Sequence, residues 1–231
     1  MTTDVLANLG PREQLRAGRL PRRLVQLLVG LWLYGTSMAM MIRSSLGLDP
    51  WDVFHSGLTE KTGLSFGAIV TIVGALVLLA WIPLRQMPGL GTVANVLVIG
   101  IATDVSLWLM PVPESMLVRV LLILGGIVLN GLAGALYIGA QLGTGPRDGL
   151  MTGIARRTRF SLRLVRTAIE VTVLAIGFAL GGLVGVGTVL YALAIGPLVQ
   201  KMLPWVVVRL TPPTVTVPVV TEPDIAPPNA T

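Results

Sequence analysis

The sequence predicts an all-α polytopic membrane protein, a bundle of about six transmembrane helices built from two repeated halves. Composition, a series of long apolar stretches and an internal repeat lead to this prediction. Apolar residues make up 53% of the 231 residues and charged residues only 12%, with a mean hydropathy of +0.81. Soluble domains usually carry about 25% charged residues, so lipid is expected to solvate much of this surface.

Six apolar stretches follow one another, and each is long enough to cross a bilayer. A helix rises 1.5 Å per residue, so about 20 residues span a hydrocarbon core of about 30 Å. The last two stretches share one apolar region and need a tight turn in its glycine-rich middle, at 181–185. The expected spans cover residues 24–42, 62–84, 86–110 and 120–140, and two further spans lie within 164–203.

This pattern divides the chain into four parts. The first stretch is longer than the 7–15-residue core of a signal peptide, so it is predicted to remain as a span. The Pro/Thr/Val-rich end of the chain has the composition of a disordered tail. The parts are a basic cytoplasmic tail (1–23), a first membrane repeat (24–110), a second membrane repeat (116–206) and a Pro-rich tail (211–231).

The two halves are related by an offset of 96 residues. Residues 35–100 align with 131–196 without gaps, and 21 of the 66 positions are identical. The matches include proline, aspartate and several groups of glycines, which apolar composition alone does not explain. Each unit holds three spans, so the second unit should enter the membrane from the opposite side, as an inverted-topology repeat.

The distribution of arginines gives an independent prediction of topology. With the arginine-rich N-terminus inside, the loop 43–61 falls outside and carries three acids against two cations. Its repeat partner, 147–163, then falls inside and carries five arginines against one aspartate. The positive-inside rule predicts this asymmetry. We therefore expect a multi-pass protein of the cytoplasmic membrane with both termini in the cytoplasm.

A Leu-Gly-x-x-Pro-x-Asp motif follows the first span of each half. Proline suits the first turn of a helix, and an aspartate two residues later lies near the positive end of the helix dipole. One interpretation is a pair of short helices, about 50–61 and 146–157, that lie on the two membrane surfaces. The motif residues are Gly47, Pro50 and Asp52 in the first copy and Gly143, Pro146 and Asp148 in the second.

The alternative interpretation is that these helices tilt inward and point their N-termini into a shared cavity. Broken helices in inverted repeats bind solutes in this way. Asp52 and Asp148 would then be symmetry-related ligands for a cation, a proton or a polar solute.

Two further acids fall within predicted spans. An ionisable side chain in lipid costs about 3 kcal/mol or more, so it usually faces the bundle interior and has a partner. Glu170 could pair with Arg166 one turn away, or it could be neutralised by protonation in a functional role. Asp104 is a further candidate for solute or ion binding. Asn95 and Asn130 are more readily interpreted as hydrogen bonds between helices.

The residues do not favour a metal site, an enzyme or a nucleic-acid-binding protein. The chain has no cysteine and one histidine, His55, which has no carboxylate four residues later, so we expect no metal site and no cofactor. The serines have no acid–base partners, so we expect no enzyme. Cations flank apolar stretches, which argues against nucleic-acid binding. Glycine stripes at 131–143 and 177–185 predict close helix packing, within one chain or between the chains of a homodimer.

Three segments are similar to those of a known family. Leu-Gly-Leu-Asp-Pro-Trp-Asp-Val-Phe (46–54), Gly-Leu-Ser-Phe-Gly (63–67) and Gly-Leu-Gly-Thr (89–92) resemble the YczE/YyaS/YitT group of bacterial membrane proteins. The resemblance covers about 24–204 and implies an integral membrane protein of poorly defined function, sometimes suspected of transport. It supplies no ligand residues. The second motif copy differs from the first, so any site should be only approximately symmetric.

Two functions are therefore open. The first is a small secondary transporter or permease of an unknown solute. The second is a membrane scaffold or assembly factor whose arginine-rich segment, 156–166, binds anionic lipid or a partner protein. A polar cavity that joins Asp52, Asp148 and Glu170 would favour transport, and a tightly packed apolar centre would favour the scaffold.

Overall fold

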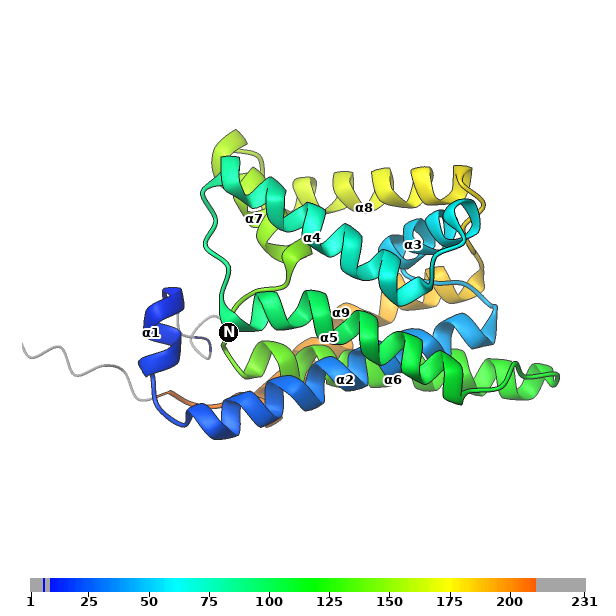
Figure 1. The fold of residues 1–231 in the computed structure, drawn as a ribbon, viewed down its shortest axis with the longest axis horizontal. Helices are drawn as coiled ribbons and strands as arrows, with labels where there is room; N and C mark the ends of the chain where they lie inside the picture. The colour runs from blue at the N-terminus through cyan, green and yellow to red at the C-terminus, as the bar shows by residue number, and fades with distance from the viewer. Residues whose placement is uncertain (1–5, 7–8, 211–231) are drawn as a thin grey trace, which may run out of the picture.

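The computed structural model describes residue 6 and residues 9–210, and the predicted tail at 211–231 lies outside this part of the chain. The described residues form an all-helical bundle, in agreement with the predicted fold class (Figure 1). Its helices are α1 (Pro11–Arg16), α2 (Leu20–Ser44), α3 (Pro50–Thr62), α4 (Phe66–Leu84), α5 (Leu90–Leu109), α6 (Met116–Gly139), α7 (Pro146–Thr158), α8 (Leu162–Ala179) and α9 (Val186–Val206).

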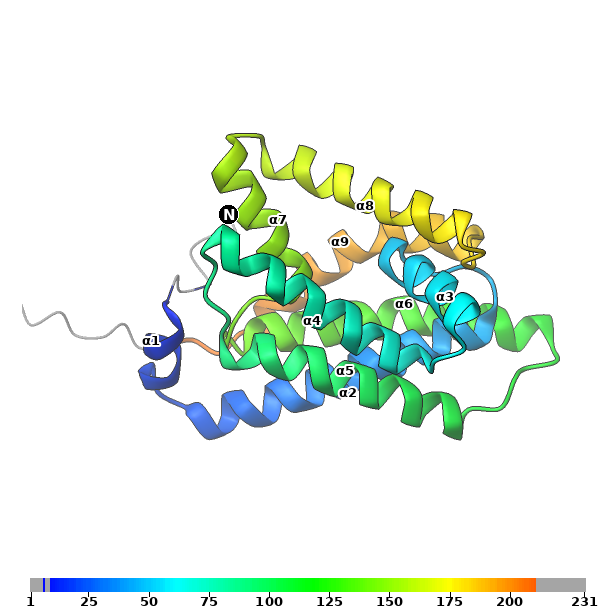
Figure 2. The same ribbon diagram turned by 45° about the horizontal axis from the view of Figure 1, so that its top comes forward.

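The helices form two layers. In Figures 1 and 2, α2, α5 and α6 lie together in one layer, and α3, α4, α7 and α8 form the other. Helix α2 packs against α5 and α6, and α9 packs against α6. Helix α4 connects the layers through its contact with α5 and packs against α7 within its own layer, while α3 packs against α8.

The packing pairs of the first half recur in the second. In the sequence repeat, α2, α3, α4 and α5 are the equivalents of α6, α7, α8 and α9, in that order. The packing of α2 against α5 therefore corresponds to the packing of α6 against α9. The packing of α3 against α8 corresponds to that of α7 against α4. One pairing breaks the pattern. Helix α4 packs closely along α5, whereas α8 has no comparable contact with α9.

Five helices in the described part of the chain are long and apolar enough to cross a membrane: α2, α4, α5, α6 and α9. Helix α8 has 18 residues but carries Arg163, Arg166 and Glu170. The expectation of about six spans therefore divides into five apolar helices and one charged helix that occupies the place equivalent to α4.

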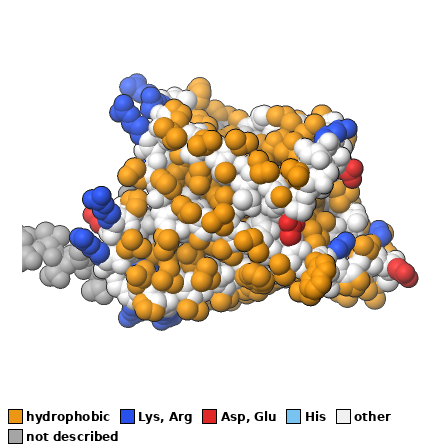
Figure 3. Space-filling view, viewed as in Figure 1, with side chains coloured by type: hydrophobic (Ala, Val, Ile, Leu, Met, Phe, Trp, Pro, Cys, Tyr) orange, Lys and Arg blue, Asp and Glu red, His pale blue; other side chains and the backbone are white. Residues whose placement is uncertain are grey.

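The molecular surface has the distribution expected of a membrane protein. Apolar side chains cover the flank of the bundle, and most charges gather at its two ends (Figure 3). Trp108 is 83% exposed at the end of α5, and Trp205 is exposed near the end of α9. These helices finish at opposite ends of the bundle, so the tryptophans have the positions of aromatic belts at the two interfaces. The end that carries α1 and the last turns of α4 and α7 is called the basic end below, and the opposite end is called the far end.

The two short helices begin inside the bundle. Asp49 and Asp52, at the start of α3, are buried, whereas Glu60 and Lys61, at its end, are exposed. Helix α7 likewise begins at the buried Pro146 and ends in exposed arginines. The interpretation as surface helices on opposite faces of the membrane is therefore wrong, because the cross-half contacts described next hold both N-termini in the interior.

The motif glycines allow the loop of each half to contact the other half. The Gly91 N–H donates to the Leu142 carbonyl at 2.7 Å, and the Gly187 N–H donates to the Leu46 carbonyl at 2.8 Å. Gly47 has φ +124°, and a Cβ there would lie 2.8 Å from the Thr188 nitrogen. Such a backbone conformation and such close approach both favour glycine. Gly143 has the equivalent position, with φ +132°.

The predicted glycine stripes pack within one chain. A Cβ at Gly131 would lie 2.9 Å from Leu198 of α9, and a Cβ at Gly177 would lie 2.5 Å from the backbone of Phe54 in α3. Small residues therefore allow α6 and α9, and α8 and α3, to approach closely.

The first span begins earlier than predicted, at Leu20, because Arg23 is part of the bundle. Its guanidinium is fully buried and donates to the carbonyls of Ala140 at 2.8 Å and Gln141 at 2.6 Å. These are groups at the C-terminal end of α6 that the helix itself leaves unpaired. The sequence suggested only a basic flank here.

Candidate functional site

A cavity of about 530 Å³ lies between the two layers, and helices α2 to α9 all contribute to its wall. Helices α3 and α7 begin at this cavity, and aliphatic residues of α4 form one side. The polar side chains that line it are Tyr34, Asp49, Trp51, His55, Asn95, Asn130, Tyr137, Arg147, Asp148, Arg166, Glu170, Tyr191 and Gln200.

Arg147 binds two aspartates of the other half. Its Nη1 lies 3.7 Å from Asp49 Oδ1, and its Nη2 lies 3.5 Å from Asp52 Oδ1. Asp52 Oδ1 also lies 3.0 Å from His55 Nδ1. Asp49 has a second role as the N-cap of α3, where its Oδ1 accepts from the N–H groups of Trp51 and Asp52.

Trp51 completes this group. The Arg147 guanidinium lies over its ring, 5.0 Å from the centroid, in a cation–π contact. An arginine that is only 26% exposed and has two carboxylates and an aromatic face is well compensated. The start of α3 is thereby connected to the start of α7.

The second charged group lies on α7 and α8. Arg166 Nε donates to Glu170 Oε1 at 2.9 Å, as the sequence spacing suggested. Asp148 lines the cavity and makes no hydrogen bond or ion pair with another residue of the described chain.

Four buried polar atoms around the cavity have no hydrogen-bond partner within the described residues. They are Asp49 Oδ2, Asp52 Oδ2, Trp51 Nε1 and Tyr137 Oη. Buried polar groups in native proteins are paired in the great majority of cases, by protein, water or ligand. Their concentration around one cavity indicates a site for polar occupants.

Asn130 and Tyr191 line the cavity and are hydrogen-bonded to each other. The Tyr191 hydroxyl donates to Asn130 Oδ1 at 3.0 Å, and Asn130 Nδ2 donates to Ser37 Oγ at 2.8 Å. Asn130 therefore connects helices, as predicted. The equivalents of Asn130 and Tyr191 in the first half are Tyr34 and Asn95, and both also line the cavity.

This correspondence extends around the wall. Ten residues of the first half line the cavity together with the residues 96 positions later. The pairs are 34 and 130, 49 and 145, 50 and 146, 51 and 147, 55 and 151, 70 and 166, 74 and 170, 95 and 191, 96 and 192, and 99 and 195. The cavity therefore lies where the two halves meet.

The remaining wall is unequal. The first half contributes Val73 and Val77 without their equivalents, and the second half contributes seven such residues, among them Tyr137, Asp148 and Val199. The first-half equivalents of these three, Met41, Asp52 and Thr103, do not line it and are fully buried.

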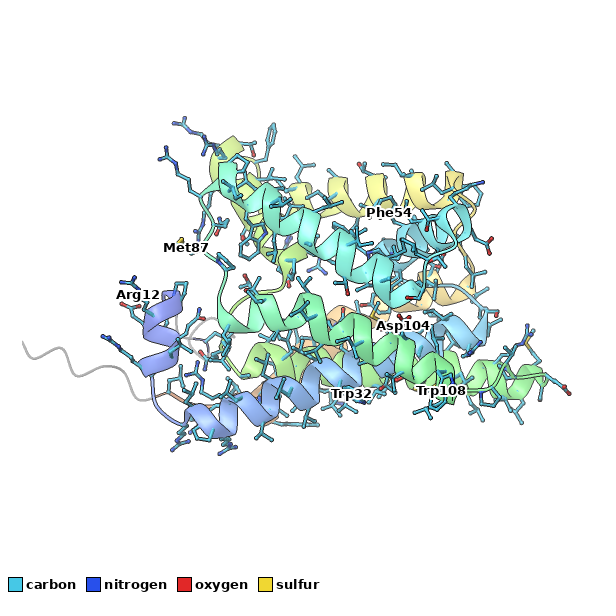
Figure 4. All side chains as sticks on the ribbon, in the orientation of Figure 1. Arg12, Trp32, Phe54, Met87, Asp104 and Trp108 are labelled. Carbon is cyan, nitrogen blue, oxygen red and sulfur yellow. The ribbon has the colours of Figure 1, made fainter. Side chains whose placement is uncertain are left out.

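The sequence candidates separate into two groups. Asp148 and Glu170 line the cavity, and Asp52 lies directly behind its wall against Arg147. Asp104 lies elsewhere: it accepts from the Ser65 hydroxyl at 2.5 Å and the Gly67 N–H at 2.8 Å, at the start of α4. Figure 4 places Asp104 toward the far end, away from Arg12 and Met87.

Arg147, Trp51 and the tyrosines were not among the predicted site residues. The repeat offset could have found them, because it pairs Trp51 with Arg147 and Tyr191 with Asn95. Within the described chain no group of three histidine, aspartate or glutamate side chains is arranged to hold a metal ion.

Comparison with known proteins agrees with the family resemblance. The chain is 39% identical to an uncharacterized Haemophilus influenzae protein over 177 residues (77% of this chain and 81% of the relative). It is 33% identical to the uncharacterized membrane protein YczE of Bacillus subtilis (74% and 80%) and 28% identical to YyaS of the same organism (76% and 90%). No solved structure matches. Residues 21–204 match the family of unknown function DUF6198, and the chain belongs to that family.

Proposed function

We propose that this protein is a small secondary transporter of the bacterial cytoplasmic membrane that binds one solute in the central cavity. The observation that carries the proposal is the unequal wall of a cavity shared by two repeated halves. Ten equivalent pairs line it, yet Tyr137, Asp148 and Val199 line it without their first-half equivalents, and Val73 and Val77 line it without their second-half equivalents.

The proposed topology is an inverted repeat in which α8 is the sixth span. Both termini and residues 147–163 lie in the cytoplasm, and residues 43–61 lie outside. The recurrence of packing pairs between the halves supports the repeat. The gathering of Arg85, Arg156 and Arg157 at the basic end supports the orientation, since cytoplasmic loops are rich in arginine.

Alternating access follows from this arrangement. In an inverted repeat, one half adopts the conformation of the other, and the fixed site becomes exposed to the opposite side. The second-half residues would then withdraw from the cavity. Their equivalents Met41, Asp52 and Thr103 would come to line it from the far end.

A pair of matched cysteine variants tests this exchange. Val199 lines the cavity, and its equivalent Thr103 is fully buried. The chain contains no cysteine, so Val199→Cys and Thr103→Cys each introduce one thiol. A membrane-impermeant maleimide should label Val199→Cys from the cytoplasmic side and Thr103→Cys, more slowly, from the outside.

The control is Ala39→Cys, a fully buried residue that is absent from the cavity wall. It should resist the maleimide from both sides. Resistance of Thr103→Cys to the same degree as Ala39→Cys, with Val199→Cys labelled, would contradict alternating access.

The scaffold function has one observation in its favour. Arg85, Arg156, Arg157 and Arg159 surround an open pocket of about 550 Å³ at the basic end. Such a cluster suits the headgroup of an anionic lipid. Retention of phosphatidylglycerol after purification, lost in an Arg156→Gln/Arg159→Gln variant, would support this function alongside a static result in the cysteine experiment.

A further inference from the structure

We infer that the solute is an organic cation with an apolar body, such as an amine or a quaternary ammonium compound. The inference rests on the proposed function and names the chemistry of the same cavity. Asp148 is its main ionic partner, and Asp49 and the aromatic side chains complete the site.

The charges at the cavity are unequal. Three carboxylates line it, those of Asp49, Asp148 and Glu170, and the carboxylate of Asp52 lies behind its wall. Two guanidinium groups, those of Arg147 and Arg166, oppose these four carboxylates. An uncompensated charge within a membrane bundle is costly, so a cationic occupant or bound protons must offset the excess.

The existing ion pairs identify the carboxylate that is free to bind. Arg147 is bound to Asp49 and Asp52, and Arg166 is bound to Glu170. Asp148 lines the cavity, is exposed, and makes no hydrogen bond or ion pair in the described chain. Arg166 and Arg147 act on its charge only from a longer distance.

Asp49 gives a second, independent indication of a ligand. This residue is only 3% exposed and lines the cavity. No N–H or O–H group of the described residues donates to its Oδ2, and the Asp52 carboxylate is a neighbour. A buried carboxylate oxygen without a donor is an acceptor for an N–H group or an attractive site for a cation.

The rest of the wall suits the body of such a ligand. The three tyrosines of the chain, Tyr34, Tyr137 and Tyr191, all line the cavity together with Trp51. Aromatic faces attract cations, and organic ammonium ligands are recognised in this way. Aliphatic residues of α4 provide an apolar side, and about 530 Å³ is within the usual volume for a small-molecule site.

An anionic solute is the main competitor. The N-terminus of α7, the Trp51 indole N–H and the Tyr137 hydroxyl could donate to one. However, an anion would add to the acid excess, and Arg147 is already shared between two carboxylates. A cation removes the imbalance that an anion would increase.

Two probes of similar size and opposite charge separate these alternatives. Equilibrium dialysis of the full chain in zwitterionic nanodiscs would measure binding of tetraphenylphosphonium and tetraphenylborate, with empty nanodiscs subtracted. Tetraethylammonium serves as a smaller cation. We expect saturable binding of at least one cation and at least tenfold weaker binding in Asp148→Asn.

The control variants address charge and folding. Glu60→Gln removes an exposed acid at the end of α3 and should bind as the unaltered protein does. Asp148→Glu keeps the charge and should restore most of the affinity lost in Asp148→Asn. Size-exclusion profiles and thermal unfolding of each variant establish that it is folded.

Each outcome of these experiments supports or overturns a stated part of the inference. Stronger binding of tetraphenylborate, affinity unchanged in Asp148→Asn, or no saturable binding of either cation would overturn the inference. If Thr103→Cys is labelled but no cation binds, the solute is not an organic cation and the proposal of a transporter stands. Cation binding with Thr103→Cys as resistant as the buried control would retain the site and reject transport.

Discussion

Trp51 and Arg147 occupy equivalent positions in the two repeats, 96 residues apart, and they contact each other with the guanidinium 5.0 Å from the ring centroid. Two equivalent residues that touch must lie on either side of any axis that relates the halves. The axis of the proposed inverted repeat would therefore pass between these two residues of the cavity wall. One half places an aromatic ring here and the other half places a cation, so the two halves differ chemically at the position where their equivalent residues meet.

Arg147→Ala should destabilise the protein strongly. It leaves Asp49 and Asp52 buried without their cation, and removal of one partner from a buried ion pair typically costs about 3–5 kcal/mol. Because the Arg147 side chain is 26% exposed, we expect about 3 kcal/mol. Thermal unfolding in detergent measures the change. The matched control is Arg159→Ala, an exposed arginine of the basic end. If both variants unfold at the same temperature, the ion pairs contribute little.

Asp52→Asn and Asp148→Asn should be non-additive. Asp52 is ion-paired with Arg147, and the charge of Arg147 also acts on Asp148 from a longer distance, so one guanidinium couples the two carboxylates. Two mutations in one ion-pair network typically show an interaction energy of about 0.5–3 kcal/mol. A double-mutant cycle on unfolding free energy measures the coupling. Asp104→Asn provides the comparison, since its interactions are at the start of α4, and it should add to Asp148→Asn without coupling.

Asp104→Ala should weaken the bundle without affecting the cavity. Its carboxylate accepts from Ser65 and the Gly67 N–H, and loss of such a helix-start acceptor typically costs about 1 kcal/mol. Cation binding should remain within twofold of the unaltered protein. A large loss of binding in a folded Asp104→Ala variant would show that the site extends beyond the cavity.

Gly47→Ala and Gly143→Ala should both impair folding. Each glycine has a positive φ, and each approaches a threonine of the other half too closely for a Cβ. We expect a loss of folded yield or at least about 2 kcal/mol of stability, measured by fluorescence-detected size exclusion and thermal unfolding. Gly196→Ala is the control, because a Cβ there would meet nothing within 4 Å. Equal tolerance at all three positions would contradict the close packing of the loops.

Cysteine labelling tests the topology. Glu60→Cys should react with an impermeant maleimide in intact cells, and Arg156→Cys should react only after permeabilisation. Both positions are exposed at the ends of the equivalent helices α3 and α7, so their intrinsic accessibility is similar. Reaction of both from the same side would rule out the inverted arrangement.

Much of the fold was predictable because its signals are local. Charge-free length identified the spans, and the Pro-x-Asp motif identified the starts of α3 and α7. The direction of those helices was not predictable, because it depends on bonds such as Gly91 to Leu142 between distant segments. Asp104 illustrates the same limit. The sequence predicts that an acid within a span costs free energy. Only the tertiary structure shows that hydrogen bonds from the start of α4 stabilise this carboxylate.

Arg147 was overlooked for a related reason. Arg147 was counted with the other arginines of 147–163 as a charge that indicates topology. Arg156 and Arg157, at the end of the same helix, are indeed exposed. The partial burial of Arg147 follows from its position at the start of α7, inside the bundle. The equivalent residue, Trp51, provides the aromatic face.

The hydrogen bonds that cross between the halves have a consequence for biosynthesis. The Gly91 N–H in the first turn of α5 donates to the carbonyl of Leu142, which is synthesised about fifty residues later. The Leu46 carbonyl in the loop after α2 accepts from the Gly187 N–H of α9, which is synthesised later still. The first half can therefore be inserted by the translocon but cannot reach its final packing while the ribosome is still translating the second. Assembly must be post-insertional, and a nascent chain stalled before residue 142 should be a substrate for membrane quality-control proteases.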